Sequence, residues 1–104
     1  MSNCVFCKIV NWETPSQQVY EDDQFIAFLD INPMNWGHTL VIPRGHYENV
    51  LDVPEDILAG MIKIAKKVAP AVVSAMKADG FNIEINNGRA AGQLVDHVHI
   101  HVIP

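Results

Sequence analysis

The last eight residues of the chain alternate histidine with apolar residues, and this alternation constrains the backbone more than any other feature. His97, His99 and His101 are each separated by one valine or isoleucine. Because successive side chains of a strand point to opposite faces, a strand over residues 97–103 places all three imidazoles on one face. In a helix the same side chains would scatter around the axis. The intervening β-branched residues favour a strand and are expected to pack under a helix.

Four more strands are predicted from short apolar runs that end at turn-forming residues: residues 19–20, 24–29, 38–42 and 81–85. Within residues 24–29 both alternating sets of side chains are apolar, so at least one face of this strand belongs to the core. Residues 4–10 are compatible with one or two helical turns.

A long amphipathic helix is predicted within residues 52–79, where apolar residues recur every three or four positions. Asp52 and Glu55 have the spacing of a capping box, and Gly80 offers a left-handed stop. Pro70 removes one backbone hydrogen bond, so we expect a kink or a break in the turn before it.

The order of these elements predicts an α+β fold. Strands precede and follow one long helix instead of alternating with helices, which excludes parallel βαβ winding and indicates a mostly antiparallel sheet with the helix on one face. A chain of 104 residues is expected to form one domain over residues 1–104.

Charge and cysteine content narrow the function classes. The chain has 12 acidic and 7 basic residues, which excludes the basic footprint of a duplex nucleic-acid binder but allows a small anionic ligand held by local donors. No apolar run predicts a membrane span and no signal peptide is recognisable, so we expect a cytoplasmic protein. Cys4 and Cys7 form a C-x-x-C pair, which in a reducing compartment indicates metal binding or redox chemistry more than a structural disulfide.

The three aligned imidazoles fit two chemistries. They can bind a metal that activates water, or one of them can act as a nucleophile while its neighbours provide charge and orientation. Residues 86–93, NNGRAAGQ, precede the histidines and combine small residues, glycines and amide side chains. Such a loop can direct several N–H groups at one anion, and donors beside a nucleophilic imidazole favour phosphoryl or nucleotidyl transfer.

The ending GQLVDHVHIHVIP resembles the histidine triad of the HIT superfamily. The likeness continues through the C-x-x-C pair, FLDINP, GHTLVIPRGH, the long helix and NNGRAAGQ, in the family's order. The third histidine differs from the galactose-1-phosphate uridylyltransferase branch, which carries glutamine there. The AGQ loop is more similar to Hint-like nucleoside phosphoramidases than to Fhit-like dinucleoside polyphosphate hydrolases. The resemblance implies the HIT fold: a five-stranded, mainly antiparallel sheet with one long helix and a short N-terminal helix.

The resemblance also implies roles for individual residues. His99 matches the family nucleophile, which attacks the α-phosphorus of a purine nucleotide and forms a nucleotidyl-histidine intermediate. His101 would contact the phosphate and share its developing charge. Asp30 would accept hydrogen bonds from the ribose hydroxyls, and His38 would lie near the nucleophile. The phosphate oxygens would also be held by Asn86 and Gln93, and the base would be walled by Phe6, Ile9, Phe28, Ile31 and Leu40.

A structural zinc site is a further implication of the resemblance. Some bacterial-type members, and the uridylyltransferases, use two N-terminal cysteines, a histidine after the third strand and the first triad histidine. The matching residues here are Cys4, Cys7, His46 and His97. Zinc would tie the N-terminus to the last strand, which helps a small domain. The alternative is two small buried thiols without a metal.

Two positions depart from the family pattern, and the chain ends early. Leu94 stands where Hint-like relatives often carry a hydroxyl that bonds the phosphate, and Asp96 precedes the triad where an aromatic or another residue is common. Many relatives continue past the triad with a tail that helps to form the pocket, whereas this sequence stops at Pro104, so it is either minimal or truncated.

The leading hypothesis is an enzyme: a nucleoside phosphoramidase, or a related nucleotide hydrolase or nucleotidyl transferase. The alternatives are a dinucleoside polyphosphate hydrolase, a zinc hydrolase that uses the triad itself as ligands, and a nucleotide-binding interaction protein with weak catalysis. HIT relatives pair through the long helix and the fourth strand, so we also expect a homodimer.

Overall fold

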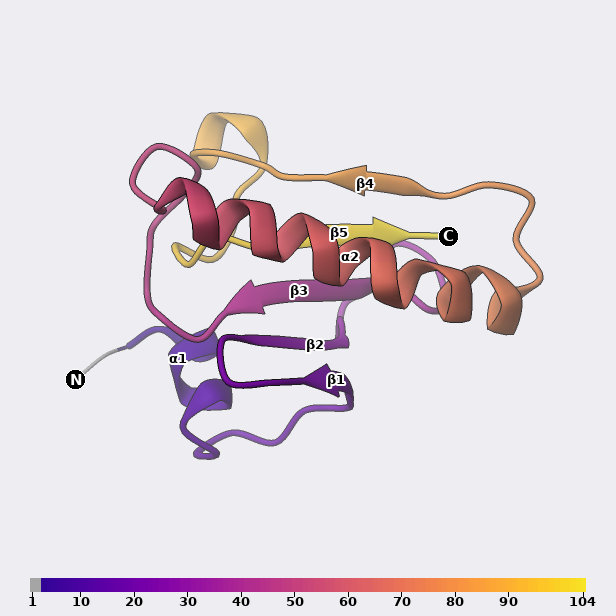
Figure 1. Ribbon diagram of the computed structural model, residues 1–104, viewed down its shortest axis with the longest axis horizontal. Helices are drawn as coiled ribbons and strands as arrows, with labels where there is room; N and C mark the ends of the chain where they lie inside the picture. The colour runs from indigo at the N-terminus through magenta and orange to yellow at the C-terminus, as the bar shows by residue number, and fades with distance from the viewer. Residues whose placement is uncertain (1–2) are drawn as a thin grey trace.

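The computed structural model describes residues 3–104, which form an α+β fold around one five-stranded sheet (Figure 1). The strands are β1 (Gln18–Glu21), β2 (Phe25–Leu29), β3 (Thr39–Pro43), β4 (Asn82–Glu84) and β5 (Ile100–Ile103). The helices are α1 (Val5–Val10), α2 (Glu55–Met76) and the 3-10 turn η1 (Arg89–Ala91).

The strand order across the sheet is β1-β2-β3-β5-β4, and each neighbouring pair is antiparallel. The predicted fold class is therefore confirmed. The ends of β1 to β4 differ from the predicted strands by at most one residue.

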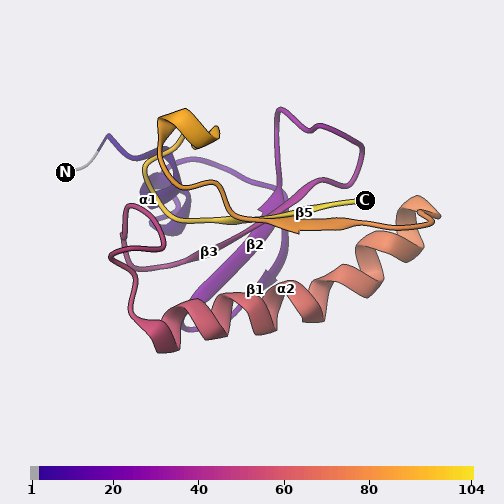
Figure 2. The same ribbon diagram turned by 90° about the horizontal axis from the view of Figure 1, so that it is seen from above.

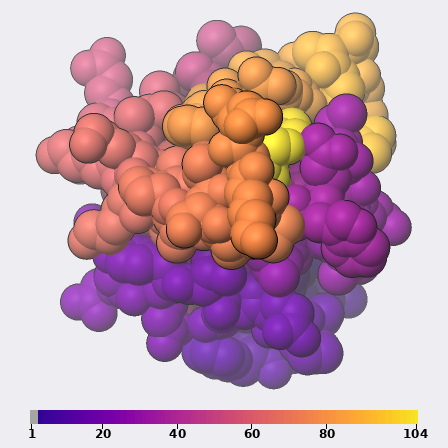
Figure 3. Space-filling view, turned by 90° about the vertical axis from the view of Figure 1, so that its right-hand side faces the viewer, coloured from indigo at the N-terminus to yellow at the C-terminus, as the bar shows by residue number. Residues whose placement is uncertain are grey.

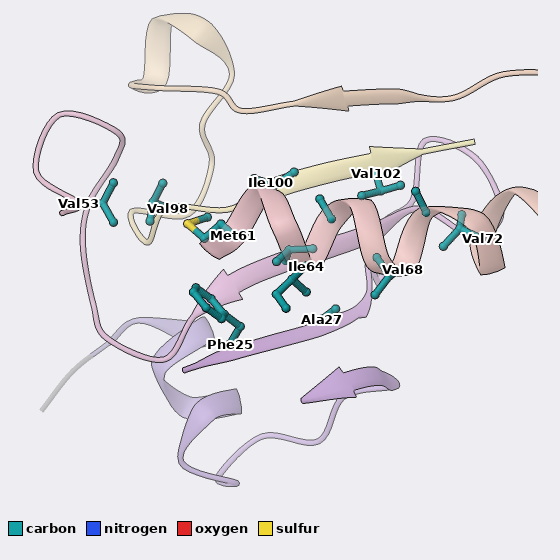
Figure 4. Packing of buried hydrophobic residues seen from close by; sticks show 13 residues of the cluster. Phe25, Ala27, Val53, Met61, Ile64, Val68, Val72, Val98, Ile100 and Val102 are labelled. Atoms are coloured by element: carbon teal, nitrogen blue, oxygen red, sulfur yellow. The ribbon is translucent and has the colours of Figure 1, made fainter. Parts of the chain in front are cut away.

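Both faces of the central strands are buried. Phe25 and Ala27 of β2 belong to the cluster beneath α2, whereas Ile26 and Phe28 belong to a second cluster that includes the apolar side of α1. Figure 2 shows α2 on one side of the sheet and α1 and η1 on the other, and Figure 4 shows the packing beneath α2. A Cβ atom at Gly60 of α2 would clash with the ring of Phe25, so the absence of a side chain there lets the helix approach β2 closely.

The expected capping box at the start of α2 is wrong. The helix begins at Glu55 with Pro54 as its N-cap, and no side chain caps it. Asp52 instead accepts hydrogen bonds from the backbone N–H groups of Glu48 (3.1 Å) and Asn49 (3.0 Å). The carboxylate therefore closes the preceding turn, because both of its oxygens are already used there.

Pro70 lies inside α2 without splitting it. The helix is continuous over Glu55–Met76, and Pro70 sits on its exposed face, although Figure 2 shows the helix bending in its C-terminal half. The left-handed residue that ends the helix is Lys77 (φ 52°), not the expected Gly80. No helix within residues 3–104 is both long and apolar enough to cross a bilayer.

Candidate active site and metal-ligand cluster

His97, His99 and His101 form a histidine row on the side of the sheet opposite α2. The ring centroids of His99 and His101 are 4.8 Å apart. The Phe6 ring of α1 packs edge-on against His97 at 5.8 Å and against His99 at 5.1 Å. The residues that alternate with the histidines pack beneath α2, as the alternation predicts.

The paired strand begins at Ile100, so the expected strand over residues 97–103 starts too early. Extending the register of β3 and β5 by two residues would place Val98 opposite Pro43. Proline has no N–H group to donate to a ladder. The N–H group of Val98 donates instead to the carbonyl of Tyr47 at 2.7 Å, which holds residues 97–99 outside the sheet.

His99 is buried, and its hydrogen bond fixes which ring nitrogen is available. Its Nδ1 lies 2.7 Å from the carbonyl oxygen of His97. A carbonyl can only accept, so Nδ1 carries the proton and Nε2 keeps a lone pair. Burial lowers the pKa of His99 below its ordinary value, which favours the neutral ring. The arrangement is that of a neutral imidazole nucleophile with one nitrogen available for attack.

His101 ends a chain of hydrogen bonds that starts at the backbone. The N–H group of Met34 donates to Nδ1 of His38 at 3.1 Å, so neutral His38 carries its proton on Nε2. This Nε2 lies 2.9 Å from Nδ1 of His101, which leaves the His101 proton on Nε2. That buried nitrogen has no hydrogen-bond partner among the described residues. The Asp30 carboxylate lies 3.7 Å from Nε2 of His38.

His38 and His101, which share this hydrogen bond, are both neutral at pH 7. Burial, together with His99 and His38 nearby, lowers the pKa of His101 to about 4. Burial also lowers the pKa of His38. His101 can therefore share the charge of a phosphate only as a neutral N–H donor.

The loop before the row is tightly wound around η1. Gly88 and Gly92 flank η1 with φ values of 89° and 97°, which side-chain-bearing residues rarely adopt. The Asn86 amide nitrogen lies 3.5 Å from the position that a Cβ atom at Gly92 would occupy. Gly92 lines the cavity described below, whereas Asn86 is not among its lining residues.

Gln93 holds this loop together instead of facing a ligand. Its Oε1 accepts from the N–H group of Gly88 at 2.8 Å, and its Nε2 donates to the carbonyls of Glu48 (2.6 Å) and Val95 (2.9 Å). The side chain is almost fully buried. The expected direct contact of Gln93 with phosphate oxygens is therefore not what the structure shows.

A cavity of about 310 Å³ lies beside His99, His101 and Asp30. It is lined by all five residues expected to wall the base: Phe6, Ile9, Phe28, Ile31 and Leu40. The cavity is also lined by residues that no sequence pattern identified: Val5 of α1, residues 14–16 of the irregular segment after α1, Leu29, Asn32 and Val95.

The two departures from the family pattern differ in their distance from this cavity. Leu94 lines its rim and is 75% exposed. Asp96 lies away from it and is 3.7 Å from the Arg89 guanidinium at the surface.

Cys4, Cys7, His46 and His97 form a second cluster, in which the four ligand atoms lie within 4.8 Å of one another. The Nδ1 atoms of the two histidines are 3.2 Å apart, and three sulfur–nitrogen distances in the cluster are 3.3, 3.5 and 3.6 Å. A tetrahedral zinc site, with Zn–N of about 2.0 Å and Zn–S of about 2.3 Å, separates two nitrogen ligands by about 3.3 Å and a nitrogen from a sulfur ligand by about 3.5 Å. The cluster therefore fits a metal ion of zinc's size and preference.

His97 is prepared for such a role by its second nitrogen. Its Nε2 donates to the carbonyl of Pro43 at 2.9 Å, so the lone pair of Nδ1 faces the thiols. Burial lowers the pKa of His97 to about 4, and the ring is neutral, as a metal ligand must be. The three row histidines thus do not converge on one point. This geometry disfavours the hypothesis that the triad itself binds a catalytic metal.

Comparison with known proteins identifies the family of the chain. A family model described as the HIT domain matches residues 11–104. An uncharacterized HIT-like protein of Methanocaldococcus jannaschii is 54% identical over 101 residues, covering 97% of this chain and 78% of the relative.

Two relatives have names that state an activity. Adenylylsulfatase HINT3 of Arabidopsis thaliana is 44% identical over 103 residues, covering 99% of this chain and 52% of the relative. Adenosine 5'-monophosphoramidase HNT1 of Saccharomyces cerevisiae is 46% identical over 101 residues, covering 97% of this chain and 61% of the relative.

A solved structure is similar over nearly the whole chain. The zinc-bound histidine triad family protein of Mycobacterium smegmatis has a TM-score of 0.94 at 46% identity, covering 98% of this chain and 74% of that one. The family match spans the sheet and the histidine row, and the relatives are similar along almost the full length, so the protein belongs to the HIT (histidine triad) family.

Proposed function

We propose that the protein cleaves purine nucleoside phosphoramidates and related nucleotides at the α-phosphorus through a nucleotidyl intermediate on His99. The observation that carries this proposal is the fixed state of the His99 ring: its Nδ1 proton is held by the His97 carbonyl, and the ring lines the cavity. The names of the plant and yeast relatives, an adenylylsulfatase and a monophosphoramidase, support nucleotide hydrolysis as the reaction class.

The first step forms one bond and breaks one. The lone pair of His99 Nε2 attacks the α-phosphorus, the bond to the leaving nitrogen breaks, and the amine departs after taking a proton from water. His101 Nε2–H lacks a partner among the described residues and would donate to a phosphate oxygen in the transition state. In the second step water attacks the phosphorus, passes a proton to the hydroxide left by the first step, and displaces His99 Nε2, which releases the nucleoside monophosphate and restores neutral His99.

The rest of the cavity would bind the nucleoside. The Asp30 carboxylate would accept from the ribose hydroxyls, and the apolar wall that includes Phe28 and Leu40 would pack against the base. Asn86 would approach the phosphate next to Gly92. Gln93 would act indirectly, by holding the loop in shape.

A substrate comparison with intermediate trapping tests this proposal. Adenosine 5'-phosphoramidate labelled at phosphorus should leave label on the protein after a quench without acid, and its turnover should exceed that of diadenosine tetraphosphate. Faster turnover of the dinucleotide would favour the polyphosphate hydrolase. Adenosine monophosphate binding with negligible turnover of both would favour an interaction protein. Product formation in a single turnover without trapped label would contradict the histidine nucleophile.

We propose, second, that Cys4, Cys7, His46 and His97 hold one structural zinc ion per chain. Support comes from the spacing of the four ligand atoms and from the zinc-bound relative of Mycobacterium smegmatis. When bound, zinc would supply cross-linking and no reaction step. Protein purified without added metal or chelator should contain close to one zinc per chain, and a value near zero would contradict the proposal.

We propose, third, that the protein is a homodimer that pairs along β4 and α2. β4 is an edge strand whose residues, Ile83 included, are all exposed, and Phe81 before it and Ile62 and Met76 of α2 also expose apolar side chains. Figure 3 shows the segment around β4 in orange at the surface beside the end of the chain. An exposed apolar edge needs cover. Sedimentation at micromolar concentration should give twice the mass of one chain, and a monomer would contradict the proposal.

A further inference from the structure

Helix α1 connects the cysteine–histidine cluster to the nucleotide cavity. It spans only six residues, Val5–Val10, with Cys4 as its N-cap and Cys7 as its third residue. Isolated helices shorter than about 12 residues are marginal in water, so α1 depends on contacts outside itself. Its thiols lie in the cluster, whereas Phe6 and Ile9 are buried against the sheet.

The buried side of α1 forms one wall of the cavity. Val5, Phe6 and Ile9 line it, and residues 14–16, which follow the helix, line it as well. The rest of the lining comes from sheet residues, from loop residues and from His99 and His101. Phe6 also touches His99 at 5.1 Å between centroids, so displacement of α1 would both widen the cavity and remove a neighbour of the nucleophile.

The cluster ties α1 to distant parts of the chain. Cys4 approaches His97, which is 93 residues away, and Cys7 approaches His46, which is 39 residues away. His46 follows β3 and His97 precedes β5, so both belong to the part of the molecule that carries the row. A metal ion that joins these four side chains closes long loops, which is where a cross-link restricts the chain most.

We infer that this cluster is a latch for the wall of the nucleotide cavity: metal bound to it holds α1 against the sheet, and its occupancy thereby sets the affinity for nucleotide. The inference rests on the proposed function and adds a means of regulating the same site. Loss of the metal frees α1 while the sheet and α2 stay folded, because the cluster beneath α2 contains no residue of α1.

The test compares metal-loaded protein with protein stripped by a chelator. The dissociation constant for adenosine monophosphate is measured by calorimetry, and amide hydrogen exchange is followed in residues 5–10 with β2 and β3 as the internal reference. Stripping should weaken binding about tenfold, an ordinary size for coupling between two sites, and should expose α1 to exchange while β2 and β3 stay protected.

A control variant separates the latch from general stability. Val72→Ala removes volume from the cluster beneath α2, far from α1 and the cavity near His99. It should lower the melting temperature yet keep the metal-loaded affinity within about twofold. If Val72→Ala weakens binding as much as stripping does, the affinity follows stability alone and the inference is wrong.

A second variant keeps the test decisive if the stripped protein unfolds. His46→Ala removes an exposed ligand and leaves three, so the metal is held more weakly without a buried void. Its nucleotide affinity should rise as zinc is titrated in, and an affinity independent of zinc would overturn the latch.

The outcomes also separate the latch from the function on which it rests. If the metal-loaded protein binds no adenosine monophosphate, the proposed function and the affinity part of the inference both fail. Amide exchange in α1 still tests whether the metal holds α1 against the sheet. Protection of α1 that falls when the metal is removed supports the latch, and unchanged protection overturns it. If nucleotide binds equally well to both forms, only the latch is overturned.

Discussion

His97 and His101, at the two ends of the histidine row, carry the same side chain but have opposite hydrogen-bonding patterns. At the first end, His97 gives its Nε2 proton to a backbone carbonyl and turns a bare Nδ1 toward two thiols and His46. At the other end, Nδ1 of His101 accepts a hydrogen bond from His38, and the N–H group on Nε2 has no partner among the described residues, in a ring that lines the cavity. Lone pairs therefore converge at the His97 end, whereas the His101 end presents an N–H donor.

The difference arises from which nitrogen the backbone engages. The Pro43 carbonyl fixes Nε2 of His97 as a donor, and the Met34 amide fixes Nδ1 of His38 as an acceptor. Converging lone pairs suit a cation, and a converging N–H suits an anion. Residue type and spacing along a strand therefore do not define the chemistry of a histidine; its backbone partner does.

The largest expected effect is on kcat, from substitution of His99, which lies between His97 and His101. His99→Ala removes the proposed nucleophile and should lower kcat at least about a thousandfold, because the covalent route is lost. Adenosine monophosphate should still bind within a few-fold of the wild-type affinity. Steady-state turnover and calorimetry measure both quantities, with Lys63→Ala on the exposed face of α2 as the preparation control. Near wild-type turnover would rule out this mechanism.

Cys4→Ser tests the metal end alone. Serine preserves an N-cap acceptor for α1 while it removes a soft metal ligand. The melting temperature should fall by about 10 °C, since metal binding contributes folding free energy. At saturating substrate kcat should change less than about tenfold. Scanning calorimetry with and without chelator measures the first effect, and a variant as stable as the wild type would contradict zinc binding.

His101→Ala tests the donor at the other end. It should lower kcat about a hundredfold, because one transition-state hydrogen bond is lost while the nucleophile remains. The labelled intermediate should still form, more slowly, and rapid-quench kinetics measures its rate. If His101→Ala lowered kcat as much as His99→Ala does, His101 would be as essential to the chemical step as the nucleophile, and the assigned difference in roles would be wrong.

The smallest effect should appear in the acid dependence of stability. Folded His101 has a pKa of about 4 against 6.5 for an ordinary histidine, so the unfolded chain binds a proton first as pH falls. Between pH 6.5 and pH 4 this residue therefore makes the fold progressively less stable. Urea unfolding at pH 7 and pH 5 should show a larger loss for the wild type than for His101→Ala. Equal losses would mean that burial does not hold His101 neutral.

The sequence predicted those parts of the fold that depend on local periodicity. The alternation in residues 24–29 and the spacing within α2 depend only on which side chains must be buried, and both were borne out. The grouping of His99, His101 and Asp30 beside one cavity was expected from the family resemblance and not from local periodicity, because these residues lie on or next to different strands.

Features that depend on tertiary hydrogen bonds could not be predicted from the sequence. Gln93 turns inward because the Glu48 carbonyl is close, and Glu48 lies 45 residues away along the chain. The paired part of β5 starts late because Pro43 of a neighbouring strand offers no N–H group, which the alternation at residues 97–103 does not reveal. Asp52 faces two backbone donors of a turn whose shape was not foreseeable.

The strand order has a consequence for how the molecule assembles. β5 comes after all the other strands along the chain, yet it lies between β3 and β4. The β1–β2–β3 meander can form from local contacts early, whereas β4 has no neighbour within the described sheet until β5 arrives. Pairing over such sequence distances is slow, so the segment that bears His101 should be the last to dock during folding. Completion of the sheet and assembly of the histidine row are then one kinetic event.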